Sequence, residues 1–186
     1  YILNGVKRTA EQLSKEAIYI EREKLKENGG LQDQIFAAYG GFNRIDFSNN
    51  SFSIQPIVLS DEKINALERS CMLFFTGDVR SSSGIHNKIS ESNQANNVHQ
   101  IYDKMKKYVD EAHSILTQSK SSKKMIEDIG NLIDKSWEAK KKISGYISNE
   151  KIDYIHKKGK EAGAYGGKIC GAGAGGFFLF IVPEDK

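Results

Sequence analysis

The sequence has little cysteine, little proline and no long hydrophobic run. Its 186 residues include two cysteines, two prolines and one tryptophan. Cys71 and Cys170 each lie in an apolar stretch, so we expect buried thiols in a reducing compartment such as the cytoplasm, not a disulfide. No apolar run approaches the roughly 20 residues that a membrane-spanning helix needs. These features exclude disulfide-rich and membrane-spanning classes of protein.

A strong charge of either sign is also lacking. Lysine and arginine number 27, aspartate and glutamate 24, and the net charge is +3. A charge this small, spread over predicted helices, indicates neither a nucleic-acid nor a membrane partner. The densest basic clusters, Lys140–Lys142 and Lys157–Lys158, are expected on solvated helix faces.

The common nucleotide-binding signatures are absent too. No Walker loop occurs, and although Gly171, Gly173 and Gly176 satisfy G-x-G-x-x-G, a dinucleotide site needs a helix after the glycines. Here the glycines lead into Phe-Phe-Leu-Phe-Ile-Val at 177–182, which is typical of a buried strand. The pattern therefore predicts two strands joined by a glycine loop. That loop is either a tight hairpin or a place where a ligand approaches the backbone closely.

Periodicity predicts an α+β fold, in which helices pack on one face of an antiparallel sheet. Thr9 and Gln12 form a capping box at the start of the first helix, and Pro56 indicates that its strand is an edge strand or carries a bulge. Strand 71–75 is expected to be buried. The expected helices cover 10–27, 32–39, 61–69, 96–119, 122–144 and 150–162, and the expected strands are 42–47, 52–59, 71–75 and the two that flank the glycine loop.

Two further stretches have residues suited to chemistry. Asp33 follows Gly29-Gly30 in the first turn of a predicted helix, where backbone N–H groups stabilise a carboxylate; it is either a helix-terminal acid or a catalytic base. Thr76–Ser83 follows a strand and combines hydroxyls, N–H groups and Arg80, which suits an anion, although a polar loop before a helix would look the same. The four histidines show no metal-ligand spacing.

Several stretches together resemble the GHMP kinases. Gly163-Ala164, Gly166–Lys168 and Cys170–Phe177 resemble the family's third signature motif, and Gly30-x-x-Asp33-Gln34 resembles the catalytic segment of its galactokinases. Thr76–Ser83 resembles a stretch of its bacterial heptose-phosphate kinases. The resemblance also takes in Ser136–Lys141, Ile147–Asn149 and Ile152-Asp153, so it runs nearly from end to end.

The resemblance implies a reaction and a set of roles. The reaction is transfer of the γ-phosphoryl group of ATP to the anomeric hydroxyl of D-glycero-D-manno-heptose 7-phosphate, giving the 1,7-bisphosphate for nucleotide-activated heptose synthesis. Asp33 would be the catalytic base and Glu21 the Mg²⁺ ligand, with Glu23 as an imperfect rival. Cofactor-binding residues would be Gly171, Gly173, Gly175 and Gly176; substrate-binding residues would be Asp33, Gly41, Thr76, Gly77, Arg80, Ser81, Ser82 and Gly173.

By the same resemblance, residues 1–40 are the remnant of the N-terminal kinase domain and 41–186 are the ferredoxin-like C-terminal domain. Tyr1–Asn4 reads as the end of a helix whose ATP-binding loop is not in this sequence, so we expect these 186 residues alone not to catalyse transfer. Alternatives are a fucokinase- or galactokinase-like enzyme and a non-catalytic sugar-binding regulator. A purely helical interaction module is disfavoured by the strands. The oligomeric state stays open, and a homodimer is allowed.

Overall fold

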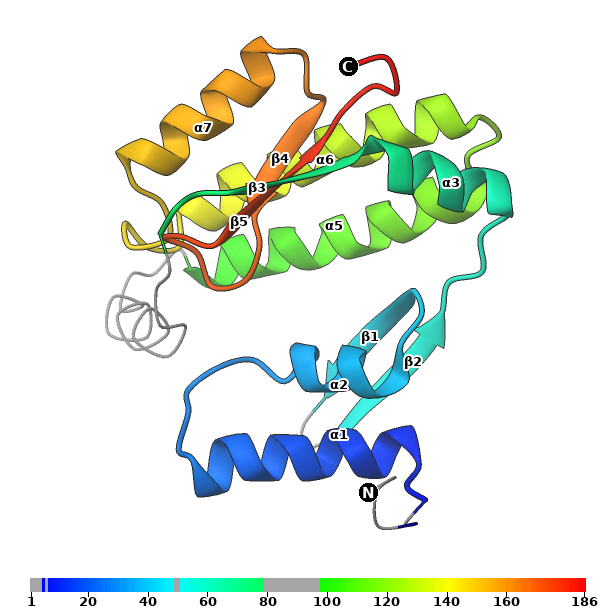
Figure 1. Ribbon diagram of the computed structural model, residues 1–186, viewed down its shortest axis with the longest axis vertical. Coiled ribbons are helices and arrows are strands. Elements are labelled where there is room, and N and C mark those ends of the chain that lie inside the picture. Colours follow the sequence, from blue (N-terminus) through cyan, green and yellow to red (C-terminus); the bar gives the residue numbers. More distant parts are fainter. Residues whose placement is uncertain (1–4, 6, 49–50, 79–97) are drawn as a thin grey trace. The chain divides into compact units, whose positions relative to one another are not determined.

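The computed structural model describes residues 5, 7–48, 51–78 and 98–186 (Figure 1). The chain divides into two compact units, Tyr1–Ile57 and Val58–Lys186. The hairpin after residue 40 thus belongs to the first compact unit. The assignment of 1–40 and 41–186 to two kinase domains stays a prediction, and the helix end predicted at Tyr1–Asn4 lies outside the described residues.

The first unit begins with helix α1, Ala10–Tyr19. The predicted capping box is confirmed, because the Gln12 N–H donates to the Thr9 hydroxyl (3.2 Å) and the Thr9 N–H donates to the Gln12 side chain (3.0 Å). The expected α-helix to residue 27 changes into a π-helical segment, η2, at Ile20–Lys24. There the Leu25 N–H donates to the Ile20 carbonyl, five residues back (2.9 Å).

Helix α2 and a β-hairpin complete this unit. Helix α2 covers Gln32–Tyr39, as predicted, and strands β1 (Asn43–Ser48) and β2 (Ser51–Pro56) pair antiparallel. The Tyr39 and Phe52 rings meet edge to face with centroids 6.2 Å apart, which ties α2 to the hairpin. The described sheet has only these two strands, so Pro56 stands on an edge strand, as expected.

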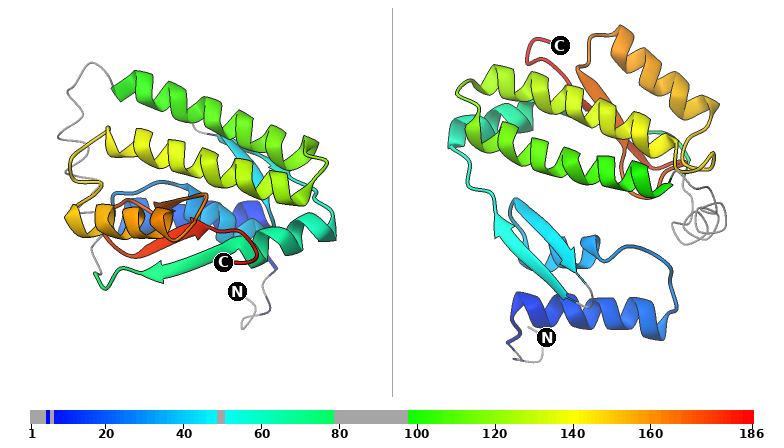
Figure 2. Two further views of the ribbon diagram at one scale, coloured as in Figure 1. Left: turned by 90° about the horizontal axis from the view of Figure 1, so that it is seen from above. Right: turned by 180° about the vertical axis from the view of Figure 1, so that it is seen from behind.

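The second unit has a three-stranded antiparallel sheet in the order β3-β5-β4. Helices α6 and α7 cover one face of this sheet, where Phe178 of β5 meets both of them, and α5 packs against α6 (Figures 1 and 2), which confirms the predicted α+β arrangement. Each predicted helix of this unit is present within a few residues of its expected ends. In chain order the elements are α3 (Asp61–Ser70), β3 (Cys71–Phe75), α5 (Val98–Gln118), α6 (Ser122–Lys141), α7 (Glu150–Glu161), β4 (Gly166–Ile169) and β5 (Phe177–Ile181).

Helix α6 contributes to both hydrophobic clusters of the second unit. Its Trp137, 1% exposed, meets Phe178 of β5 edge to face with ring centroids 6.1 Å apart. Its Met125 and Ile129 pack with Ile181 in the second cluster. The core therefore lies between α6 and the sheet, and it supports the strands that lead into and out of the glycine loop.

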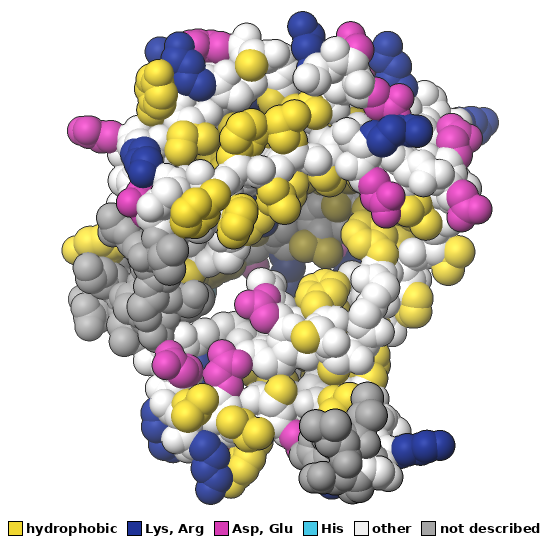
Figure 3. All heavy atoms as spheres, viewed as in Figure 1, with side chains coloured by type: hydrophobic (Ala, Val, Ile, Leu, Met, Phe, Trp, Pro, Cys, Tyr) yellow, Lys and Arg dark blue, Asp and Glu magenta, His cyan; other side chains and the backbone are white. Residues whose placement is uncertain are grey.

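The prediction that Cys71–Phe75 is a buried strand is wrong in one respect. The strand forms, but all five residues are exposed, Met72 to 37% and Leu73 to 61%. The reason is that β3 is an edge strand of the described sheet, and that Cys71, Leu73 and Phe75 lie on the face opposite the one where Phe178 meets Trp137 of α6. Figure 3 shows hydrophobic side chains gathered on this face of the second unit. Cys71 and Cys170 are both exposed, so the expectation of buried thiols is also wrong.

A polar network joins α6, α7 and the start of β4. Asp134 lies 2.7 Å from His156 Nε2 and 3.2 Å from Lys160 Nζ, and Lys160 also donates to the Tyr165 carbonyl (2.6 Å). Burial alone would raise the pKa of Asp134, but the bonds from His156 and Lys160 outweigh it and hold that pKa below its ordinary value. His156 is therefore a satisfied histidine, as expected, and it stacks on Phe178.

We expect Asp134→Asn to lower the free energy of unfolding by about 1–2 kcal/mol at neutral pH, a figure reduced because the carboxylate is partly solvated. Because the folded pKa lies below the unfolded one, this contribution is present at neutral pH and disappears as the pH falls through the folded pKa. Urea unfolding at several pH values measures it. The control is Asp128→Asn, whose carboxylate pairs with Lys124 within the same helix; an equal loss in both variants would contradict the network's role.

Candidate functional site

The glycine loop Cys170–Gly176 joins β4 to β5, as predicted. The Cys170 N–H closes it by donating to the Phe177 carbonyl (2.8 Å). Gly171, Gly173 and Gly176 have φ values of +74°, +119° and +91°, and Ala174 also has a positive φ of +60°. A side chain at the three glycine positions would be strained, so glycine here is a requirement of the backbone path.

The middle of the loop is fixed by the segment between α6 and α7. The Ala174 N–H donates to the Ile147 carbonyl (2.8 Å), and the Asn149 amide lies 3.5 Å from the Ala174 carbonyl. A Cβ on Gly173 would come within 2.7 Å of that Ile147 oxygen. The contact explains why Ile147–Asn149 and the glycine loop belong to one site although they are far apart in sequence.

The end of the loop is fixed by the segment after β3. The backbone N–H and the hydroxyl of Thr76 both donate to the Gly176 carbonyl (2.8 and 2.9 Å), and the Gly176 N–H donates to the Asp78 carbonyl (2.9 Å). Lys151 pairs with the Asp78 carboxylate at 3.0 Å. Thr76 and Gly77, predicted as substrate contacts, thus lie directly beside the glycine loop. Arg80, Ser81 and Ser82 lie outside the described residues.

Unpaired N–H groups give the loop its chemistry. Within the described part of the chain, the N–H groups of Gly171, Ala172, Gly173 and Gly175 make no hydrogen bond. Gly173 is buried, and a buried N–H without a partner is rare and costly. Successive N–H groups in a backbone with left-handed residues form concave anion sites. The loop is therefore suited to contact a phosphate or another anion.

Lys140, near the end of α6, is a contact that the sequence interpretation missed. Its side chain is half-buried and its Nζ donates to the Gly171 carbonyl (2.6 Å). Burial, together with the nearby Lys168 ammonium, lowers the pKa of Lys140 to about 8. The expectation that Lys140–Lys142 lies on a solvated face is therefore wrong for Lys140. The signals in the sequence were its place one position before the end of an amphipathic helix and its inclusion in the Ser136–Lys141 stretch of the resemblance.

Asp33 lies in the first turn of α2, as predicted. Its carboxylate is exposed and makes no hydrogen bond or ion pair among residues 5–48 and 51–57 that the structure describes. Helix α2 has no side-chain cap, because Leu31 occupies the N-cap position. The carboxylate is therefore the group nearest in sequence that can complement the N-terminal dipole of this helix, and it is accessible to a substrate.

Glu21 lies in the π-helical segment and reaches the start of α2. Its half-buried carboxylate accepts a hydrogen bond from the Gln34 amide, next to Asp33 in sequence. Glu23, the rival for the metal role, is exposed and pairs with Lys26 at 3.4 Å. Within the first unit, the structure thus brings Glu21, and not Glu23, to the segment that holds Asp33. Gly41 follows Gly40 after α2, and both have a positive φ.

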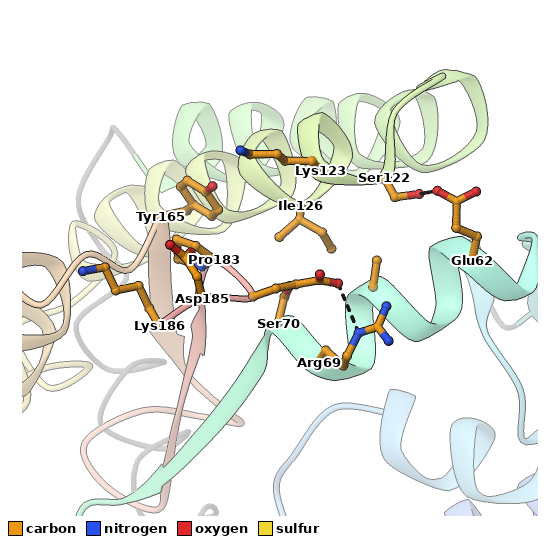
Figure 4. A pocket seen from close by; sticks show the side chains of 12 residues that line it. Glu62, Arg69, Ser70, Ser122, Lys123, Ile126, Tyr165, Pro183, Asp185 and Lys186 are labelled. Atoms are coloured by element: carbon orange, nitrogen blue, oxygen red, sulfur yellow. Dashed lines mark hydrogen bonds and ion pairs between the residues drawn. The ribbon is translucent and has the colours of Figure 1, made fainter.

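A cavity of about 690 Å³ lies at the other end of the second unit's sheet, between α3, the start of α6 and residues 183–186 (Figure 4). None of the predicted site residues lines it. Several charged side chains that line it already have polar partners: Arg69 pairs with Glu184 (3.1 Å), and Glu62 accepts a hydrogen bond from Ser122 (2.7 Å). This cavity therefore favours no single ligand charge, and the chemistry of the glycine loop is the better guide to function.

Among the residues that the structure describes, no cluster of three or more histidine, cysteine or acidic side chains could hold a metal. No helix in the same residues is long and apolar enough to cross a membrane.

Comparison with known proteins agrees with this geometry. A family model described as "GHMP kinases C terminal" matches residues 118–186. The chain is 34% identical over 183 residues to the D-glycero-alpha-D-manno-heptose 7-phosphate kinase of Campylobacter jejuni, covering 94% of this chain and 50% of that protein. It is also 26% identical to the bifunctional fucokinase/GDP-fucose pyrophosphorylase of Arabidopsis thaliana, over 85% of this chain and 15% of that protein.

The fold is that of solved GHMP kinases. The crystal structure of a D-glycero-D-manno-heptose 1-phosphate kinase from Bacteroides thetaiotaomicron superposes with a TM-score of 0.70 at 24% identity, covering 98% of this chain and 48% of that one. These findings confirm the resemblance to the GHMP kinase superfamily, and residues 118–186 match the model of its C-terminal domain. Within that superfamily it is similar to the heptose 7-phosphate kinase of C. jejuni. The chain spans about half the length of that relative.

Proposed function

We propose that this chain is part of a GHMP sugar kinase that uses ATP to phosphorylate the anomeric hydroxyl of D-glycero-D-manno-heptose 7-phosphate. The observation that carries the proposal is the 34% identity to a heptose 7-phosphate kinase over nearly the whole chain. The unpaired N–H groups of the glycine loop support it, because a kinase of this substrate handles phosphate at both ends of the sugar. The product would be the 1,7-bisphosphate, formed in the cytoplasm.

In this proposal Asp33 accepts the proton of the anomeric hydroxyl. The hydroxyl oxygen then forms a bond to the γ-phosphorus of ATP while the bond from that phosphorus to the β–γ bridging oxygen breaks, and ADP leaves with the electron pair. Phosphoryl transfer depends mainly on positioning and on stabilising the charge of the phosphoryl oxygens. Among the residues that the structure describes, the exposed carboxylate of Asp33 and several N–H groups of the loop have no partner, so they are suited to these two tasks.

Magnesium would supply charge neutralisation at the phosphates of ATP. Glu21 is the residue proposed to hold it. Its carboxylate is half-buried beside Gln34 at the start of α2, and a carboxylate oxygen is the kind of ligand that Mg²⁺ prefers. One or two carboxylates commonly suffice, because waters and phosphates complete the octahedron.

A fucokinase-like enzyme is the second candidate. The similarity to the plant fucokinase fusion favours it, although the identity is lower, at 26%. The two candidates differ in one chemical respect, since only the heptose substrate already has a phosphate. Arg80, Ser81, Ser82 and Gly77 are proposed to bind that phosphate, and Thr76, whose two donors bond the Gly176 carbonyl, is proposed to hold this segment beside the loop.

We expect Arg80→Ala to raise the KM for heptose 7-phosphate by roughly tenfold to a hundredfold or more, because a charge-assisted hydrogen bond to phosphate contributes about 1.5–3 kcal/mol. The KM for ATP should stay within about twofold. Steady-state kinetics of the full-length protein measure both, with Arg69→Ala as the control, because Arg69 pairs with Glu184 at the distant cavity. An equal rise in both KM values would remove Arg80 from the sugar-phosphate site.

A further inference from the structure

We infer that Lys140 is a positioning residue, which fixes the entrance of the glycine loop through its hydrogen bond to the Gly171 carbonyl. The inference rests on the proposed function in one respect only, namely that the ligand of the positioned loop is ATP. The bond itself, 2.6 Å long, joins the last turn of α6 to a residue 31 positions later. Neither the family resemblance nor the glycine pattern indicated that a side chain of α6 holds the loop.

The three parts of the loop are held differently. The middle is tied to the Ile147 carbonyl and the Asn149 amide, and the end is tied to the N–H and hydroxyl of Thr76 and to the Asp78 carbonyl. The entrance has one backbone closure, from Cys170 to Phe177, and beyond it the side chain of Lys140. Lys140 is thus the side chain that bonds the entrance of the loop at Gly171, next to the Ala172 and Gly173 N–H groups that are unpaired in the described structure.

The direction of the Gly171 peptide explains why this contact matters. A carbonyl oxygen and the next N–H belong to one rigid peptide plane, so holding the Gly171 oxygen also sets the direction of the Ala172 N–H. Gly171 is exposed, and a Cβ there would meet nothing within 4 Å, so packing does not restrain this peptide. The lysine replaces the restraint that packing does not supply.

The charged and titratable groups that face Lys140 are Lys168 and Cys170. Lys168 is a like charge, and burial also disfavours the ammonium, so the pKa of Lys140 falls to about 8. The contact should therefore weaken between pH 7 and pH 9, as Nζ loses its charge. An arginine at this position would stay charged over the same range. Burying this charge costs stability, so a change in unfolding free energy alone does not report on the loop.

The experiment compares Lys140→Met, Lys140→Arg and the control Lys142→Met, which removes the same charge from an exposed position two residues on. The first readout is amide hydrogen exchange in the 186-residue chain, which needs no activity. In Lys140→Met we expect exchange at Cys170, whose N–H closes the entrance of the loop, to be about tenfold faster, with Ala174, Gly176, β5 and α6 unchanged. Lys142→Met should match the unmutated chain, and Lys140→Arg should restore slow exchange.

The second readout is the KM for ATP in the full-length protein. Lys140→Met should raise it about tenfold and leave the KM for heptose 7-phosphate within about twofold, and the unmutated enzyme should show a rise from pH 7 to pH 9 that Lys140→Arg lacks. Unchanged loop exchange in Lys140→Met, or equal changes in Lys142→Met, would overturn the inference. If no sugar is phosphorylated at all, the proposed function fails, while the exchange data still decide the role of Lys140.

Discussion

Replacing Asp33 by asparagine in the full-length protein is expected to lower kcat by roughly 10²–10⁴. The amide has nearly the same shape as the carboxylate but cannot accept the proton of the anomeric hydroxyl. Because Asp33 is exposed and makes no hydrogen bond in the described structure, its replacement should leave α2 and the stability of the first unit nearly unchanged. Steady-state kinetics with heptose 7-phosphate and ATP measure the effect.

Glu23→Gln is the matched control for this experiment. It also neutralises an exposed acid of the first unit, and it breaks only the weak ion pair with Lys26. The KM for the sugar should change little in either variant. A loss of kcat below tenfold in Asp33→Asn would assign Asp33 to the helix terminus only, and the general base would have to be another residue.

Gly173→Ala is expected to lower kcat/KM by roughly a hundredfold or more. Its Cβ would come within 2.7 Å of the Ile147 carbonyl oxygen, at a φ of +119° that residues with side chains rarely adopt. The backbone must therefore move, and displacing a binding group by about 1 Å can cost a hundredfold in rate. The free energy of unfolding should fall by about 1–3 kcal/mol, while helix content measured by circular dichroism stays unchanged.

Gly145→Ala provides the comparison for the glycine loop. Gly145 lies after α6, and a Cβ there would meet nothing within 4 Å. This variant should retain both stability and activity. If Gly173→Ala lost stability but kept kcat/KM within tenfold of the unmutated enzyme, the loop would be a structural hairpin and not part of the active site.

Local signals in the sequence predicted the elements well. The capping box of Thr9 and Gln12, the spacing of apolar residues in α6, and the glycines between two apolar strands each depend on neighbours within a few positions. For the same reason the glycine loop and the first turn of α2 could be chosen as candidate sites, since both consist of residues adjacent in sequence.

Properties that depend on distant partners could not be predicted in this way. The exposure of Leu73 follows from the position of β3 at the edge of the described sheet, which composition does not reveal. Lys140 reads as one of three consecutive lysines, and only the tertiary structure shows that it meets Gly171. The π-helical turn that brings Glu21 toward Gln34 likewise has no signature of its own in the sequence.

The substrate preference of the unmutated full-length protein tests the central proposal most directly. The measurement is kcat/KM with ATP for D-glycero-D-manno-heptose 7-phosphate and for the same heptose without its phosphate, with the product identified by phosphorus NMR. We predict a preference of roughly tenfold to a hundredfold or more for the phosphorylated sugar, and a product with phosphate on the anomeric oxygen as well as on carbon 7. Equal kcat/KM values for the two sugars would contradict the heptose-phosphate assignment and favour the fucokinase-like alternative.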